Sequence, residues 1–269
     1  MSAFNRKAAI KNQKYMLEQL DLNQSVSKTE YKKQLPLLQA NLYDLEHEVF
    51  MKKIPVMIVF EGWAAAGKGS TINVLAERLD PRGFRVVPVS PPRTAETRYP
   101  WMHRFWLKIP ARGQMVAFDT SWYRRVLIDR INKDVKRREW ERAYNDIAEF
   151  EEMLAADGMV ILKFWLHITE KEQGKRFKKL LGDKLTKWQV TEEDRAQHKK
   201  YKKYLAAVEE MLARTDSPHA PWTIVEAHDR YFTRMKVYET IIKALEIRLA
   251  GESAPPAKAA SPKKEARHA

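Results

Sequence analysis

A glycine-rich segment directly after an apolar run constrains the fold of this chain more than any other feature. Residues 55–60 read PVMIVF, which is typical of a buried strand in a parallel sheet. Residues 62–70 then read GWAAAGKGS and match the pattern G-x-x-x-x-G-K. In that pattern, the loop and the helix after it turn backbone N–H groups toward an anion, and the lysine adds a full positive charge. The sequence therefore predicts a phosphate-binding loop between a strand and a helix.

The loop and one aspartate supply the first candidate site residues. The loop residues expected to hold phosphate are Gly62, Ala64, Ala65, Ala66, Gly67, Lys68, Gly69 and Ser70. Gly69 stands where the general pattern has a Mg²⁺-binding Ser or Thr, so the metal must be held mainly elsewhere or by Ser70. Asp119 follows the apolar run MVAF, and a carboxylate at the end of a strand beside such a loop commonly positions Mg²⁺. Helix capping is the alternative role for Asp119. Glu61 precedes the loop glycine and is expected to point elsewhere.

Apolar runs alternate with amphipathic segments along the chain, which predicts an α/β fold with a parallel sheet and helices on both faces. The expected strands are 55–60, 84–89, 114–118, 159–168 and 222–227. The expected helices are 31–50, 71–79, 139–156, 171–181, 191–213 and 231–249. We expect a polar lead-in at 1–30, one domain at 31–250 and a flexible tail at 251–269, with a helical insertion at about 170–205.

The charge balance indicates a polyanionic partner. The 269 residues hold 49 Lys and Arg against 35 Asp and Glu, a net charge of +14. Residues 124–142 and 171–203 carry most of this excess, with eight basic against four acidic and twelve against five. Solvated helix faces are the alternative interpretation of both stretches. The lack of cysteine excludes thiolate chemistry, and the lack of a long apolar run or signal-like start favours a cytoplasmic protein without a membrane span.

Residues 119–125, DTSWYRR, resemble the signature of the polyphosphate kinase 2 family. Further motifs match in the same order between Tyr31 and Leu249: EGW-AAGKG, LDPRGFRV, RFW, LKFWLHIT, KWQVT and HAPWTIVEA. The last of these is most similar to the catalytic half of polyphosphate:AMP phosphotransferases. The resemblance implies a P-loop kinase fold with a helical lid. It also implies Mg²⁺-dependent phosphoryl transfer between inorganic polyphosphate and nucleoside mono- or diphosphates, by a homo-oligomer.

The resemblance also suggests roles for individual residues. The expected catalytic residues are Lys68, Asp119, Arg124 and Arg176, with Asp119 as the metal ligand. Further phosphate contacts are expected from Arg125, Lys175, Lys179 and Lys187. Lysine and arginine suit these roles because neutralising a transferring phosphoryl group is the main catalytic device available.

The chain departs from the family pattern at four positions. Ala64 replaces an aspartate, Thr120 replaces an arginine, Gln189 replaces a lysine and Arg124 replaces a small residue. The loss of the carboxylate at position 64 predicts reduced activity. One rival interpretation is therefore a polyphosphate-binding homologue with weakened catalysis. An ATP-dependent nucleoside monophosphate kinase is a second, but it explains neither the D-x-S-W-Y segment nor the basic insertion. Nucleic acid is a less favoured partner because no nucleic-acid-reading module is present.

Overall fold

Five parallel strands form one sheet in the order β2-β3-β1-β4-β5. They are β1 (Val56–Gly62), β2 (Phe84–Pro88), β3 (Met115–Asp119), β4 (Val160–His167) and β5 (Trp222–Glu226). The central strand β1 pairs with β3 on one side and with β4 on the other, and every one of its residues is buried. Burial on both faces explains why the sequence of β1 is a continuous apolar run and does not alternate.

The structure is a computed structural model that describes residues 17–253. Residues 1–16 of the predicted lead-in and 254–269 of the predicted tail lie outside the described part. The α-helices are α2 (Lys28–Met51), α3 (Lys68–Ala76), α4 (His103–Trp106), α5 (Ile128–Asn132), α6 (Arg137–Ala156), α7 (Glu170–Gly182), α8 (Glu192–Lys199), α9 (Tyr201–Thr215) and α10 (Arg230–Ser253). Short 3₁₀ helices are η1 (Leu17–Gln19), η2 (Glu96–Arg98), η3 (Trp122–Val126) and η4 (Lys187–Gln189).

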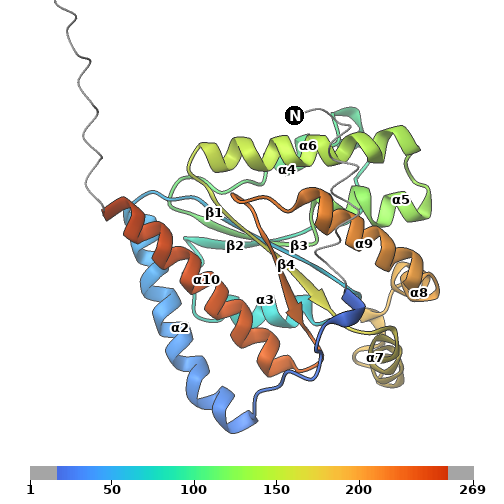
Figure 1. The fold of residues 1–269 in the computed structure, drawn as a ribbon, viewed down its shortest axis with the longest axis horizontal. Coiled ribbons are helices and arrows are strands. Elements are labelled where there is room, and N and C mark those ends of the chain that lie inside the picture. The colour runs from blue at the N-terminus through green and yellow to red at the C-terminus, as the bar shows by residue number, and fades with distance from the viewer. Residues whose placement is uncertain (1–16, 254–269) are drawn as a thin grey trace, which may run out of the picture.

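Helices cover both faces of the sheet, as the alternating pattern predicts. The long helices α2 and α10 pack on each other and lie with α3 on one face, while α6 and α9 lie on the other (Figure 1). The parallel α/β architecture expected from the sequence is confirmed. All five strands lie within a few residues of their expected positions.

The expected helix at 191–213 is wrong as a single element, because it is broken into α8 and α9 at Lys200. Lys200 has φ −110° and ψ 22°, which lies outside the helical region. None of the residues of α8 is buried, whereas α9 begins with the buried Tyr201 and buries one whole face. The predicted insertion at 170–205, called the lid segment below, comprises α7, η4, α8 and the first turn of α9.

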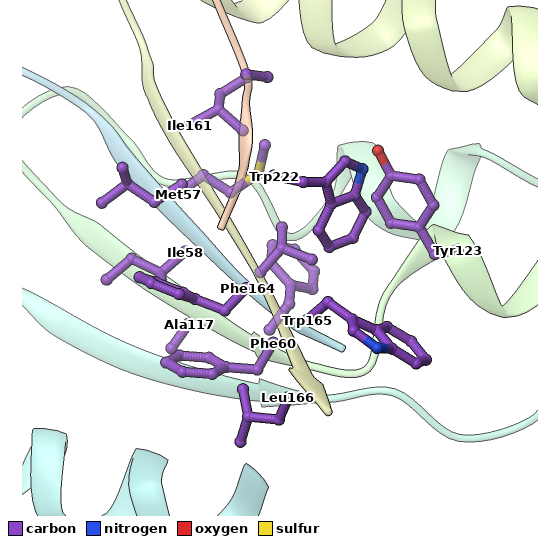
Figure 2. Close-up of a cluster of buried hydrophobic side chains, with 14 of the residues drawn as sticks. Met57, Ile58, Phe60, Ala117, Tyr123, Ile161, Phe164, Trp165, Leu166 and Trp222 are labelled. Atoms are coloured by element: carbon purple, nitrogen blue, oxygen red, sulfur yellow. The ribbon is translucent and has the colours of Figure 1, made fainter. Parts of the chain in front are cut away.

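Apolar side chains of β1, β3 and β4 form the centre of the core, with Trp222 of β5 and Tyr123 of η3 at its margin (Figure 2). A charged pair is buried at this margin. Lys163 of β4 donates to Glu151 Oε2 of α6 over 2.7 Å and to the carbonyl of Thr215 over 2.7 Å. The two charged side chains are 0% and 2% exposed.

The same carboxylate holds η3 in place. Glu151 Oε1 accepts hydrogen bonds from Tyr123 Oη at 2.7 Å and from Trp122 Nε1 at 3.1 Å. Burial raises the pKa of the Tyr123 hydroxyl well above its usual range, and the nearby Glu151 adds to that shift. The Tyr123 hydroxyl therefore remains a hydrogen-bond donor at neutral pH. The segment that follows Asp119 is fixed from the core by these contacts.

Removing one partner of this buried pair should be costly. Lys163→Met leaves the Glu151 carboxylate buried without its cation, so we expect the free energy of unfolding to fall by roughly 3 to 5 kcal/mol. The double variant Lys163→Met/Glu151→Gln removes the stranded charge and keeps an acceptor for η3, so it should regain part of that loss. Urea unfolding measures the free energies, with Lys178→Met as the exposed control. Equal stability of Lys163→Met and the control would contradict the prediction.

Candidate functional site

The predicted phosphate-binding loop lies between the end of β1 and the start of α3. Gly62 has φ 150°, and a Cβ atom there would come within 2.5 Å of the Leu166 carbonyl oxygen of β4. Glycine is therefore required at this crossing. Gly67 has φ 103° and Ala65 has φ 60°, so the loop backbone has positive φ angles at two further positions. Helix α3 begins at the next residue, Lys68.

The amides at the start of α3 face outward without a protein partner. Within residues 17–253, no protein acceptor pairs with the N–H groups of Lys68, Gly69 and Ser70, because the first hydrogen bond of this helix is donated by Thr71 to Gly67. Free N–H groups at a helix N-terminus carry partial positive charge and bind anions. The Lys68 ammonium lies on the same loop and donates to the carbonyls of Gly62 at 3.0 Å and Trp63 at 3.3 Å.

Two other loop amides are already paired in this structure. The Ala66 amide donates to the Trp63 carbonyl at 3.0 Å. The Ala64 amide donates to Gln197 Oε1 of the lid segment at 2.9 Å. The amides at the start of α3 are therefore better placed for an incoming phosphate than those at 64 and 66, and phosphate binding by each loop residue stays a prediction.

Asp119 lies at the carboxyl end of β3, beside the start of α3. It pairs in the sheet with Phe60, and its Oδ2 atom lies 3.8 Å from the position of a Cβ atom built on Gly69. The strand-end carboxylate and the helix N-terminus are thus brought together as the sequence predicts. Ser70 Oγ donates to the Gly67 carbonyl at 3.0 Å, so its hydroxyl is also at this end of the helix.

Glu61 does not point elsewhere, contrary to the sequence-based expectation. Its side chain is buried and accepts a hydrogen bond from Ser121 Oγ at 2.7 Å, and it lines the same cavity as Lys68. Burial raises the pKa of Glu61 to about 7, against the lowering effects of Ser121 and Lys68, while Asp119 adds to the rise. The sequence did contain a signal for the role of Glu61. It is an acidic residue in an otherwise apolar, fully buried strand, where a carboxylate needs a polar partner.

Two adjoining cavities open beside the loop. The first has a volume of about 160 Å³ and is lined by Glu61, Gly62, Ala64, Lys68, Thr120 and Arg124, together with residues of α8. The second has a volume of about 360 Å³. Its lining includes four aromatic residues (Tyr99, Trp101, Phe105 and Trp122), four arginines (Arg104, Arg124, Arg125 and Arg142) and three acidic residues (Glu96, Asp129 and Glu139). Arg124 lines both, so the phosphate-loop cavity continues into one that combines aromatic rings with positive charge.

The two arginines after the D-x-S-W-Y segment have different surroundings. Arg124 donates to both carboxylate oxygens of Glu193 on α8, at 2.9 and 2.6 Å, and its Nε lies 3.0 Å from Asp129 Oδ1. Arg125 lies 5.6 Å from the ring centre of Trp101, and its Nη2 is 3.4 Å from Glu139 Oε1. Arg124 is thus ion-paired with the lid segment, and Arg125 faces the larger cavity.

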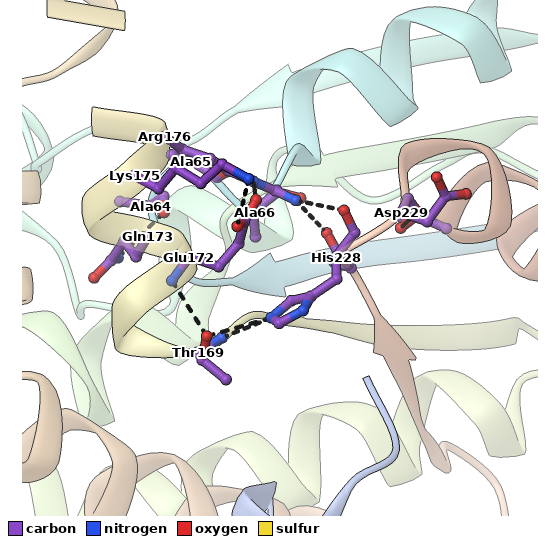
Figure 3. A network of polar contacts seen from close by, with 12 residues as sticks. Ala64, Ala65, Ala66, Thr169, Glu172, Gln173, Lys175, Arg176, His228 and Asp229 are labelled. Carbon is purple, nitrogen blue, oxygen red and sulfur yellow. Dashed lines mark hydrogen bonds and ion pairs between the residues drawn. The ribbon is translucent and has the colours of Figure 1, made fainter. Parts of the chain in front are cut away.

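Arg176 of α7 holds the phosphate loop through its carbonyls (Figure 3). Its Nη1 donates to the Ala65 carbonyl at 3.0 Å and to that of Ala66 at 3.2 Å. Its Nη2 reaches the carbonyls of Ala227 and His228 at 2.7 and 2.9 Å, and its Nε donates to Glu172 at 2.8 Å. A guanidinium with these partners fixes the loop against the end of β5, and a phosphate contact would have to replace one of them. Its catalytic role stays a prediction.

The three candidate lysines of the lid segment are exposed. Lys175 and Lys179 lie on α7, Lys187 lies on η4, and none of them lines either cavity. Lys175 Nζ is 3.6 Å from Glu172, with the lysine side chain 80% exposed. The structure therefore does not gather them around the loop, and any contact with a substrate would be made by its part outside the cavities.

The buried His167 contacts Trp63 of the phosphate-binding loop. His167 Nδ1 accepts a hydrogen bond from Trp63 Nε1 at 3.2 Å, and the Trp63 ring stacks on Tyr201 at 4.0 Å between ring centres. Burial lowers the pKa of His167 to about 4. The imidazole is therefore uncharged near neutral pH and can serve as the acceptor that the Trp63 indole requires.

Two features are absent from residues 17–253. No group of three or more His, Cys, Asp or Glu residues is arranged to hold a metal ion. No helix is long and apolar enough to cross a membrane.

The parallel sheet, the free helix N-terminus, the loop lysine and the strand-end aspartate define a P-loop fold. A family model described as polyphosphate kinase 2 matches residues 25–252. Because this match covers most of the sequence, the chain belongs to the polyphosphate kinase 2 family.

Relatives and solved structures agree with this assignment. A polyphosphate:AMP phosphotransferase of Pseudomonas syringae pv. tomato is 41% identical over 235 residues, which are 87% of this chain and 47% of the relative. An ADP-polyphosphate phosphotransferase of Rhizobium meliloti is 35% identical and is matched over 72% of its length by 82% of this chain. The crystal structure of polyphosphate kinase 2 from Arthrobacter aurescens has a TM-score of 0.82 at 26% identity, covering 92% of this chain and 89% of that one. The chain spans about half the length of the Pseudomonas relative.

The buried His167 should make stability depend on pH. Its pKa falls from an ordinary 6.5 to about 4, so its contribution is present above pH 6.5 and is lost as the pH falls toward 4. Between pH 7 and 4.5, wild type should lose roughly 2 to 3 kcal/mol more unfolding free energy than His167→Gln. Glu61, with its raised pKa, acts in the opposite direction but equally in both proteins. Urea unfolding at the two pH values measures this difference, and an exposed control, His47→Gln, should behave like wild type. Identical pH dependence of wild type and His167→Gln would refute the prediction.

Proposed function

We propose that this chain transfers phosphoryl groups between inorganic polyphosphate and a nucleoside mono- or diphosphate. The observation that carries the proposal is the loop at 62–70, where Lys68 lines a cavity and the free amides at the start of α3 lie beside the Asp119 carboxylate. Family membership narrows the phosphate donor, since the relatives are named for transfer between polyphosphate and AMP or ADP.

The loop residues have distinct roles in this proposal. The amides of Lys68, Gly69 and Ser70 hold the terminal phosphates, and the Lys68 ammonium leaves its loop carbonyls to bridge the transferring group. An oxygen of the nucleotide phosphate attacks the terminal phosphorus of polyphosphate. The P–O bond to the rest of the polymer breaks, and the shortened polyphosphate leaves with its negative charge. Preorganised N–H donors stabilise the charge of that transition state.

A magnesium ion fits the donors present. Mg²⁺ prefers oxygen ligands, and at phosphate sites it is commonly held by one or two carboxylates with the remaining positions filled by phosphate and water. Asp119 supplies one carboxylate and Ser70 a hydroxyl at the start of α3, and substrate phosphates and water would fill the remaining positions. When bound there, the ion would neutralise phosphate charge. Asp119 would hold that ion beside the loop amides.

The larger cavity suits the nucleotide. The rings of Tyr99 and Trp101 can stack on a base, while Arg104, Arg125 and Arg142 can contact its phosphate. Arg124 connects this cavity to the loop, which allows the nucleotide phosphate to meet the polyphosphate end. Polyphosphate outside the cavities would follow the exposed lysines of the lid segment. The cytoplasmic location and the homo-oligomer stay predictions.

A polyphosphate-binding protein with weakened catalysis is the second candidate. Ala64 favours it, because the methyl group cannot replace the carboxylate of the family pattern. The deciding experiment mixes the purified chain with Mg²⁺, long-chain polyphosphate and AMP or ADP, and measures ADP and ATP. Product above a protein-free control supports transfer. Binding of polyphosphate without product supports the second candidate, and neither binding nor product would overturn both.

Lys68 offers the sharpest single test of the loop. It is the only full charge in residues 62–70, so Lys68→Ala should lower kcat for polyphosphate-dependent ADP formation by at least about 100-fold. The fold should be kept, because the ammonium contacts only carbonyls of its own loop. Circular dichroism checks the fold, and Lys33→Ala on the exposed face of α2 is the control. An active Lys68→Ala protein would contradict the role of the loop.

The lid-segment lysines should act as a group on polyphosphate. Charge reversal of Lys175, Lys179 and Lys187 together should raise the KM for long-chain polyphosphate at least about tenfold. The same change should leave the KM for AMP nearly unaltered, because none of the three lines a cavity. Wild-type affinity should fall steeply with salt, since exposed charges are screened over about 8 Å at physiological ionic strength. Salt-insensitive binding would show that these lysines are only a solvated surface.

A further inference from the structure

Helix α8 of the lid segment is held by polar contacts. None of its residues is buried, and its start is closed by a capping box between Thr191 and Asp194. A helix without a buried apolar face takes its position from specific side-chain contacts. Figure 1 shows α8 beside α7, and the two helices are in contact.

The first contact of α8 is with Arg124. Glu193 receives two hydrogen bonds from the guanidinium, at 2.9 and 2.6 Å, in the bidentate geometry that suits this pair best. Arg124 is only 8% exposed and also faces Asp129 at 3.0 Å. Its positive charge is therefore matched by two carboxylates, one of which belongs to the lid segment.

The second contact of α8 is with the phosphate loop. Gln197 Oε1 accepts from the Ala64 amide at 2.9 Å and from Gln173 Nε2 at 3.1 Å. Gln173 Nε2 also donates to the Ala64 carbonyl at 3.2 Å, and its Oε1 lies 2.8 Å from His198 Nδ1. Both polar atoms of Ala64 are thus held by two glutamines of the lid segment, one from α7 and one from α8.

The Ala64 methyl group completes this contact. It forms a small apolar cluster with Phe177 of α7 and Val190, the residue after η4. A carboxylate there would lie among apolar side chains, at a cost in free energy. Ala64 and Arg124 are therefore both contact points of the lid segment.

We infer that Glu193 and Gln197 are positioning residues for phosphoryl transfer, because they seat the lid segment on Arg124 and on the peptide of Ala64. The inference rests on the proposed function and adds to it a specific closed state. In that state Arg124 anchors the lid segment through Glu193. The Glu193 side chain is 36% exposed, against 9% for that of Arg124, so the carboxylate is the partner that can exchange the pair for water when the segment opens.

If Glu193 and Gln197 position the lid segment, breaking their contacts should affect kcat and KM differently. Breaking them loosens the lid segment over the reacting phosphates, which lowers kcat. At the same time it frees the charge of Arg124, which favours binding of a polyanion. A residue that only stabilised the fold would change the melting temperature without dividing its effect between kcat and KM in this way.

The experiment compares Glu193→Gln with Glu192→Gln, its exposed neighbour on the same helix. Both remove one negative charge, but only the first loses the bidentate pair. We expect kcat for AMP phosphorylation to fall at least about fivefold in Glu193→Gln, with the KM for polyphosphate unchanged or lower. Hydrogen–deuterium exchange of the amides at 192–199 should quicken in Glu193→Gln and in Gln197→Leu, and should stay as in wild type in Glu192→Gln.

Several outcomes would overturn the inference. Equal kcat and equal exchange in Glu193→Gln and Glu192→Gln would do so, and so would an effect confined to a raised KM for polyphosphate. If wild type transfers no phosphoryl group, the proposed function fails separately, and the exchange rates alone then decide whether α8 is seated by these two residues.

Discussion

The close crossing of Gly62 over β4 is the contact on which the rest of the site depends. A Cβ atom at this position would lie 2.5 Å from the Leu166 carbonyl oxygen, so only glycine lets β1 turn there. That turn places the start of α3 at the carboxyl edge of the sheet, where β3 also ends with Asp119. The free amides at the start of α3 and the Asp119 carboxylate are thus brought together by backbone geometry, without any contact from the lid segment.

Polar contacts that differ in burial surround the phosphate-binding loop and Asp119. The buried pair of Lys163 and Glu151 fixes η3 from the core, where unpaired charge would be very costly. Arg176 ties the loop carbonyls to the end of β5. The contact of Glu193 with Arg124 lies nearer the solvent, because the Glu193 side chain is 36% exposed. The most deeply buried polar contacts therefore lie between the site and the core. The lid segment, whose contacts lie nearer the solvent, is the part best suited to move.

Local sequence patterns were sufficient to predict the parallel sheet, the position of the loop between a strand and a helix, and the position of Asp119 at a strand end beside it. Short continuous apolar runs bounded by turn residues are typical of buried strands in an α/β chain, and the G-x-x-x-x-G-K spacing is typical of a phosphate-binding loop. The orientation of Glu61, the ion pair of Arg124 and the break at Lys200 were not predictable in this way. Each depends on residues 60 or more positions away, or on which side of a helix meets the core, and no local periodicity encodes such contacts. The resemblance to a family added the expected substrates, whereas the contacts of Ala64 with Gln197 and Phe177 required three dimensions.

The most direct test of the central claim is to follow backbone amide chemical shifts while polyphosphate is added to the protein with Mg²⁺. If the loop cradles the terminal phosphates, the amides of Lys68, Gly69 and Ser70 should shift at the lowest polyphosphate concentrations and by the largest amounts. The exposed lid-segment lysines should respond less and lose their response in high salt. Shifts confined to those lysines, with the three loop amides unchanged at saturation, would contradict the account.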